Sequence, residues 1–447
     1  MTDSRSTTPL QRAKETRAAI ALLIFILVLH AAHLLPQTSS ITEVTQSYPA
    51  TACPGPIGDA KATALIPNKK IAIRDINRPQ SDLVKNNQGS YLMGRGALLV
   101  EGSPANTVEL QTRANKWTAA TICTVSDPVV WFVGGTANVT SQSKIILVNS
   151  GLSDAIVDIT SYSENGATQP VPVTVKPSSE KVIRVDSLDP GSSRIAMRVE
   201  TRSGRVTSYL LDERVKGLNN VGGDFVAPLS AAARELIIPG LPIKIGDNSK
   251  VEHSIRLMTP GKIDATASIE VISPEGVFIP VGFSNFTLKP EEVRDINLSG
   301  VDLGKKTFAL KIIASEPIVA SVFTEVKRGS LSDFMWSTPV QSFGTVSFNL
   351  YGLEPTFSFV SERIQIDIAW RDNRGKSGVK NLIGEEIVNW KVPANTRVIT
   401  VTNRSGSVGA MSWVTADGVT HLPITLSTNL ESATKPIADI AVIQPKK

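Results

Sequence analysis

The chain has 447 residues, 41% of them hydrophobic and 19% charged, and its 46 basic and 41 acidic side chains give a formal net charge of +5. Four basic and two acidic residues among the first 17 supply +2 of that charge, which leaves about +3 for the remainder. So small a surplus, without long runs of one sign, is not the electrostatic footprint of a nucleic-acid-binding protein, and we expect no nucleic-acid partner.

An apolar run near the N-terminus begins at Ala18 and continues to Leu35, where Pro36 ends it. Its length of about 18 residues approaches the roughly 20 that an α-helix needs to cross a bilayer. Four basic residues precede the run and the next one follows only at Lys61. The positive-inside rule therefore places the N-terminus in the cytoplasm and the bulk of the chain outside.

The run is predicted to be a retained single-pass anchor, so the membrane is one expected partner. The alternative is an export signal that is cut, after which the chain is secreted. A cut site needs small residues, which Ala31 and Ala32 supply, whereas His30 and Leu34 fit poorly. We divide this part of the chain into a cytoplasmic tail (1–17), a transmembrane anchor (18–35) and a linker (36–60).

Two cysteines, Cys53 and Cys123, follow the anchor, on the side of the membrane where disulfides persist. We predict one disulfide, which closes a loop of about 70 residues and stabilises the fold by roughly 4 kcal/mol on the chain-entropy model. Two separate buried thiols are the alternative. A metal site is not expected, because two cysteines without a nearby histidine make half of a zinc ligand set.

Beyond the linker the chain reads as short strands with period-two alternation, as in residues 144–151 and 155–162, separated by Gly, Pro, Asn, Asp and Ser. Turn signals at intervals of roughly 8 to 12 residues are typical of β-sandwiches. Long helical periodicity is absent after the anchor. The predicted fold class is all-β: an N-terminal transmembrane helix followed by tandem immunoglobulin-like β-sandwich modules.

An internal repeat supports this division. Residues 145–166 match 254–276 in the order strand, Gly turn, strand and Gly-containing hairpin, and a Pro turn with further strands follows each. A more diverged copy runs from Arg363 to Gly418. Units of this length fit beads in a row better than a solenoid. The predicted modules are a membrane-proximal β module (61–142) and three sandwich repeats (143–236, 237–340 and 341–447).

The segment WFVGGT is the candidate binding surface. Trp131 and Phe132 follow a predicted strand, and Gly134 and Gly135 permit a backbone turn with positive φ. One interpretation is an exposed aromatic platform for a sugar. The other is that the two rings fill the seam between modules.

No catalytic, cofactor-binding or metal-binding residue is predicted, and we expect a protein that is not an enzyme. His253 and His421 are the only histidines outside the anchor region, and each is expected at a surface or strand edge. The sequence has no G-x-S-x-G elbow, H-E-x-x-H pair, C-x-x-C pair or acidic calcium loop.

Between Cys53 and Pro339, several short motifs occur in an order that resembles an actinobacterial family of single-pass envelope proteins of unknown function. The motifs are ACPGP, Cys123 before WFVGG, then LVNSG, RELIIPGLP, TPG, VFIPVG, PIVAS and SDFMW. The family's Asn-Pro-Gly turn is altered to Asn149-Ser150-Gly151 in one unit and Thr259-Pro260-Gly261 in the next. The resemblance implies an envelope location and a modular β architecture, and it carries no active site.

The function expected from these features is that of a membrane-anchored extracytoplasmic structural or interaction protein of the cell envelope. Its β-sandwich modules would be presented to an unidentified envelope protein or glycan. The alternative is a carbohydrate-binding accessory protein in envelope glycan assembly.

Overall fold

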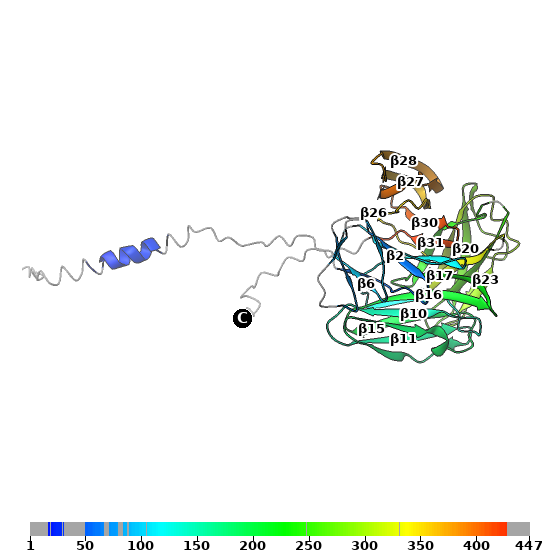
Figure 1. Cartoon of the computed structure of the whole chain (residues 1–447), viewed down its shortest axis with the longest axis horizontal. Coiled ribbons are helices and arrows are strands. Elements are labelled where there is room, and N and C mark those ends of the chain that lie inside the picture. The colour runs from blue at the N-terminus through cyan, green and yellow to red at the C-terminus, as the bar shows by residue number, and fades with distance from the viewer. Residues whose placement is uncertain are drawn as a thin grey trace, which may run out of the picture. The chain divides into compact units, whose positions relative to one another are not determined.

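The computed structural model describes residues 17, 19–28, 30, 50–66, 71–78, 84–86, 89–103, 105–246, 248–329 and 331–426. Within the predicted anchor, residues 19–28 are helical. No helix among these described residues is long and apolar enough to span a membrane. The predicted cytoplasmic tail, apart from Arg17, and most of the linker lie outside the described residues. The chain forms two units, 1–47 with 431–447 and Tyr48–Leu430, and the account below concerns the second (Figure 1).

The second unit is all-β, as predicted, and its strands fall into four modules that share one strand order. Module 1 (residues 51–122) has one sheet in the order β1-β6-β3-β4 and a second in the order β5-β2-β7-β8. Its strands are β1 (Thr51–Cys53), β2 (Lys61–Leu65), β3 (Ile71–Asp75), β4 (Val84–Asn86), β5 (Ser90–Leu92), β6 (Leu98–Val100), β7 (Val108–Arg113) and β8 (Trp117–Ile122).

Module 2 (residues 129–226) repeats this plan in the sheets β12-β11-β15-β9, where β13 also pairs with β11, and β14-β10-β16-β17. Its strands are β9 (Val129–Val133), β10 (Lys144–Asn149), β11 (Ala155–Ser163), β12 (Gly166–Ala167), β13 (Val171–Val175), β14 (Ser179–Arg184), β15 (Ala196–Ser203), β16 (Val206–Lys216) and β17 (Asn219–Val226). A short 3-10 turn spans Val185–Ser187. The sequence-based division placed β9 in the membrane-proximal module 61–142, whereas its partner is β15 of the following module.

Module 3 (residues 233–337) joins its two sheets through one long strand. Its strands are β18 (Ala233–Leu241), β19 (Ser249–Met258), β20 (Ala265–Ser273), β21 (Gly276–Phe278), β22 (Phe286–Leu288), β23 (Arg294–Asn297), β24 (Phe308–Arg328) and β25 (Leu331–Ser337). The first half of β24 pairs with β18 and β20, and the second half pairs with β19 and β25. Pro317 lies close to the crossing point, where the missing N–H of proline is tolerated.

The equivalent path in module 2 is broken into β15 and β16 at Gly204. That glycine has φ +90°, and a Cβ there would lie 2.5 Å from the Cβ of Ala155, so a side chain does not fit. The sequence match between the two repeats therefore reflects one topology, with a glycine turn in one copy and a continuous strand in the other.

Module 4 (residues 345–423) fuses further strands. Its strands are β26 (Thr345–Asn349), β27 (Thr356–Asp372), β28 (Ser377–Lys391), β29 (Thr396–Asn403), β30 (Val408–Val414) and β31 (Val419–Pro423). The first half of β27 pairs with β30, its second half pairs with β29, and β28 follows it along both halves. In the modules, the cores combine residues of both sheets, which makes each module a sandwich.

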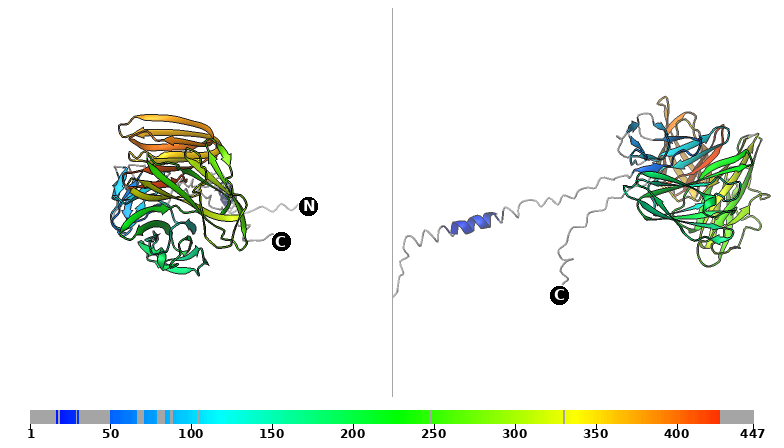
Figure 2. Two further views of the ribbon diagram at one scale, coloured as in Figure 1. Left: turned by 90° about the vertical axis from the view of Figure 1, so that its right-hand side faces the viewer. Right: turned by 60° about the horizontal axis from the view of Figure 1, so that its bottom comes forward.

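The prediction of modules in a row is wrong. The last strands of the four modules, β8, β17, β25 and β31, form a ring: β17 lies beside β25, β25 beside β31, β31 beside β8, and β8 beside β17. We call these four strands the inner strands. In the left view of Figure 2 the modules follow one another around this centre, from blue through green and yellow to orange. The four sandwiches are thus parts of one compact unit.

The ring has two different ends. A short connection from the preceding strand leads into each inner strand, from β7 to β8, β16 to β17, β24 to β25 and β30 to β31. We call this the turn end. The inner strands finish at the other end, the exit end, where the chain passes to the next module. Thr51 and Leu426, near the two limits of the described unit, line one small hollow at the exit end.

Candidate functional site

The predicted disulfide is confirmed. Cys53 at the end of β1 and Cys123 just after β8 are bonded, with their Cα atoms 4.5 Å apart and both side chains buried. The bond joins the first strand of module 1 to the exit of its inner strand. A backbone hydrogen bond from Ala52 to Thr124 runs beside it. The disulfide therefore closes module 1 where the chain enters and leaves it.

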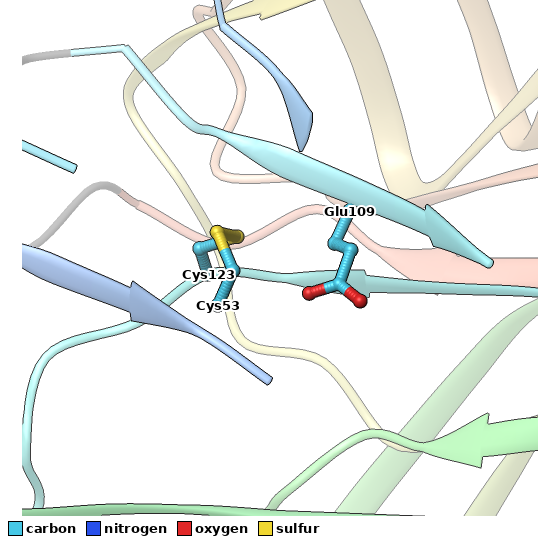
Figure 3. A group of neighbouring side chains, drawn as sticks. All are labelled: Cys53, Glu109 and Cys123. Carbon is cyan, nitrogen blue, oxygen red and sulfur yellow. A yellow bond between two sulfur atoms is a disulfide. The ribbon is translucent and has the colours of Figure 1, made fainter. Parts of the chain in front are cut away.

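Glu109 on β7 lies beside the disulfide (Figure 3). One carboxylate oxygen accepts a 2.7 Å hydrogen bond from Nε2 of Gln111, while the other has no partner. Burial raises the pKa of Glu109 well above its usual value. The carboxylate and both sulfur atoms lie within 4.8 Å of one another. Sulfurs bonded to each other lack the thiolate charge that binds a metal, so the donor set as it stands does not fit an ion.

A part-buried acid, Glu180 on β14, joins the CPGP segment to module 2. Its carboxylate accepts a hydrogen bond from the N–H of Gly55 at 3.2 Å, and burial raises its pKa to about 7. A Cβ at Gly55 would lie 2.6 Å from Oε2 of Glu180 and from the backbone of Gly96. The glycine of CPGP is therefore needed for a close approach between modules 1 and 2.

The WFVGG segment is not at a surface. Trp131 is 7% exposed and Phe132 is fully buried, so the sugar platform does not form. Trp131 packs with Tyr162 of its own module and with Met258 and Val319 of module 3. Phe132 belongs to the core of module 2. The Trp131 side chain therefore fills the seam between modules 2 and 3, which was the second interpretation.

Gly134 and Gly135 are also closely packed against neighbouring strands. A Cβ at Gly134 would lie 2.7 Å from the side chain of Val226 on the inner strand β17. Gly135 has φ +84°, and its carbonyl accepts a 2.6 Å hydrogen bond from Arg256 of module 3. The carbonyl of Val133 accepts another, at 2.5 Å, from the hydroxyl of Ser321. The segment thus offers its backbone oxygens to module 3.

Arg256 on β19 is the cation of this seam and is only 4% exposed. Its guanidinium donates two hydrogen bonds to Asp295, at 2.8 and 2.9 Å, and another to the carbonyl of Ile195 at 3.3 Å. It also lies over the ring of Trp336, 5.1 Å from the ring centre. A planar guanidinium can satisfy all of these partners at once, which an ammonium cannot.

Asp333 on β25 ties the ring together. Its Oδ1 accepts a 3.0 Å hydrogen bond from the N–H of Gly223 on β17, and its Oδ2 accepts one at 2.9 Å from Val419 on β31. Burial raises the pKa of Asp333 well above its usual value, and backbone donors that include Thr118 on β8 oppose that rise. One carboxyl group therefore meets inner strands of the other three modules.

Asp224 on β17 makes a second connection. It accepts hydrogen bonds at 2.9 Å from the N–H of Trp336 on β25 and from the hydroxyl of Thr420 on β31. The hydroxyl of Thr420 in turn accepts one at 3.0 Å from Ala120 on β8. Burial raises the pKa of Asp224, and the nearby Asp333 adds to that rise. Side chains thus bridge inner strands that belong to different sheets.

The expectation that both histidines lie at a surface or edge is wrong. His253 is 5% exposed and His421 is 1% exposed, and burial lowers the pKa of each to about 4. Nε2 of His253 donates to the carbonyl of Pro242 at 3.0 Å, and Nε2 of His421 donates to that of Pro239 at 2.9 Å. Both rings hold the PGLP segment of module 3, and His421 does so from module 4.

The comparison with family models gives one match. Residues 95–382, well over half of the chain, match the model of a family of unknown function, DUF5719. The chain belongs to this family. The match runs from module 1 into β28 of module 4 and includes Asp224, Arg256 and Asp333 of the DUF5719 chain. No curated protein matches it.

Sequence reasoning missed the two aspartates of the DUF5719 ring. A signal was present, because the last strands of modules 2 and 3 read GGDFV and LSDFMW, with Asp-Phe in both. Phe225 and Phe334 are fully buried, and each follows its aspartate. In β8 and β31 the corresponding buried polar residues are Thr118 and Thr420.

Proposed function

We propose that this DUF5719 protein is a membrane-anchored, non-enzymatic structural and interaction protein of an actinobacterial cell envelope. Its N-terminal segment holds it to the membrane, and its four sandwiches form one rigid body outside. The observation that carries the proposal is the ring of inner strands, joined across modules by buried hydrogen bonds of Asp224 and Asp333. A body fixed in this way keeps its binding surfaces in constant relative positions.

The two ends of the ring differ in what they expose. Thr51 and Leu426, near the limits of the described unit, share the exit end, whereas the turn between β16 and β17 presents Leu218, a fully exposed apolar side chain, at the turn end. We assign the turn end as the surface that meets an envelope partner.

The location is tested first. A cysteine in place of Leu218, in full-length protein, is exposed to a membrane-impermeant maleimide added to intact cells. Labelling in intact cells is the predicted result, while labelling only after lysis would place the modules in the cytoplasm and overturn the proposal. The cysteine variant of Val281, an equally exposed residue of module 3, is expected to give the same labelling.

The interaction is tested with a photo-crosslinking amino acid at the same two positions. A crosslinked product of one discrete mass is expected from position 218 and not from position 281, because residue 218 lies at the turn end. Equal products from both positions, or none from position 218, would contradict the assigned surface. The carbohydrate-binding alternative finds no support at WFVGG, because both rings there are buried.

A further inference from the structure

The described residues of modules 3 and 4 line a cleft of 530 Å³. Its walls are the loop between β18 and β19, the loop between β26 and β27, and the β30–β31 hairpin. Thr415 belongs to the turn before β31, so the cleft lies close to the turn end. A hollow of this size falls within the range of about 300 to 1,000 Å³ that small-molecule sites occupy, and such sites often lie between domains.

The floor and the walls of the cleft differ in chemistry. Ile245, Met335 and Trp413, all buried, give an apolar floor. Three hydroxyl-bearing residues, Thr307, Thr356 and Ser412, line the walls. An apolar floor with a few placed polar groups suits a ligand that has one less polar face and several hydrogen-bonding groups.

Positive charge outweighs negative charge around the cleft. Lys244 and Lys391 line it, and the guanidinium of Arg328 donates a 3.0 Å hydrogen bond to the carbonyl of Thr415 in its wall. Glu354 is the one lining acid among the described residues. It lies 3.6 Å from Lys391, and their side chains are 40% and 68% exposed. An ion pair so exposed contributes little, so a ligand anion can compete with Glu354 for the ammonium.

We propose that this cleft binds an acidic saccharide. The carboxylate of the sugar lies between Lys244 and Lys391, the ring lies over the floor at Met335 and Trp413, and the sugar hydroxyls meet the hydroxyl-lined walls. The proposal deepens the interaction role by naming a ligand class. It rests on the proposed function only in placing the cleft outside the cell, because the binding itself is a property of the purified chain.

The test uses purified full-length protein in a polyoxyethylene detergent, with isothermal titration calorimetry. Digalacturonate is the probe, and its dimethyl ester is the neutral control of the same shape. We expect the acid to bind about tenfold or more tightly than the ester, as hydrogen bonds to charged groups imply. Equal affinity for acid and ester, or no binding of the acid, would overturn the proposal, while the crosslinking result at position 218 would stand unaffected.

Variants locate the binding in the cleft. The double change Lys244→Gln and Lys391→Gln is expected to weaken binding of the acid about tenfold or more. Glu354→Gln removes the competing carboxylate and is expected to tighten it, a gain that misfolding cannot imitate. The matched control changes Lys176→Gln and Lys380→Gln at two exposed lysines elsewhere and is expected to leave affinity unchanged. Unchanged affinity in the Lys244/Lys391 variant would show that the acid binds at another place.

Discussion

Replacement of Asp333 by Ala is expected to open the ring from its centre. The change removes the acceptor of the N–H groups of Gly223 and Val419, now bonded at 3.0 and 2.9 Å. Both donors lie on strands of other modules and are buried. A buried donor left without a partner costs about 1 to 3 kcal/mol, so the two together cost about 2 to 6 kcal/mol. That is a large part of the 5 to 15 kcal/mol by which folded domains are typically stable, as an order of magnitude.

The assay is urea unfolding at pH 7, followed by tryptophan fluorescence. Asp333→Ala is expected to lower the unfolding midpoint strongly. The unfolding midpoint of Asp333→Asn, which keeps one carbonyl oxygen as an acceptor, is expected to fall between those of Asp333→Ala and the parent. Asp264→Ala is the matched control, because Asp264 is exposed and its loss is expected to change stability by less than about 0.5 kcal/mol. A midpoint for Asp333→Ala equal to that of the parent would refute the role assigned to this carboxyl group.

Four further predictions concern Asp333 and the seams between modules. Gly418→Ala is expected to destabilise the fold by roughly 1 to 3 kcal/mol in the same assay, because the new Cβ would lie 2.1 Å from Oδ2 of Asp333. The control Gly261→Ala should be close to neutral, because the nearest atom to a Cβ there is 3.7 Å away. Arg256→Ala is expected to cost about 3 to 5 kcal/mol of stability, because it leaves the part-buried Asp295 without its cation. A cost no larger than that of Arg234→Ala, a change at an exposed arginine, would contradict the role given to Arg256 between modules 2 and 3. Burial lowers the pKa of His421 to about 4, against about 6.5 in the unfolded chain. The neutral ring therefore contributes about 3 kcal/mol to the free energy of unfolding above pH 6.5, and this contribution is lost as the pH falls toward 4. His421→Gln should flatten the dependence of the urea midpoint on pH in this window. Burial raises the pKa of Glu180 to about 7. Its contribution to the free energy of unfolding is therefore present below about pH 4.5 and lost as the pH rises to 7. Glu180→Gln should cost less stability at pH 8 than at pH 5, and an equal cost at both pH values would count against the burial of this acid.

The strands and the disulfide were predictable because both rest on local or strongly constrained signals. Alternation such as that of residues 155–162 survives in β11, where Ala155, Val157 and Ile159 are buried. Two cysteines allow only one pairing within the chain. The internal repeat also predicted the topology correctly, since the matched segments form equivalent strands in modules 2 and 3.

The ring was not predictable from these signals, because polar residues close it. Asp224, Asp333 and Thr420 occupy positions that in a strand pattern read as a solvent face, yet all are fully buried against other modules. The same reason explains the error on His253 and His421, whose Nε2 atoms bond backbone carbonyls of the PGLP segment. A pattern within one module gives no information on which polar side chains find partners in the next.

The first module was not recognised as a copy of the others for a related reason. Its strands are short, and several are three residues long, as in β1 and β6. Its likeness to module 2 lies in the order of pairing, β5-β2-β7-β8 against β14-β10-β16-β17, which only the folded chain reveals.

Small-angle X-ray scattering of residues 48–430 tests the central claim, the closed ring of four sandwiches, most directly. A compact body of this length is expected to have a radius of gyration of about 21 Å. Four separate modules of about 100 residues in a row would give about 40 Å, because each has a radius of gyration near 13 Å and their centres would lie far apart. A value near 21 Å is the predicted result, and a value near 40 Å would contradict the ring and the rigid body built on it.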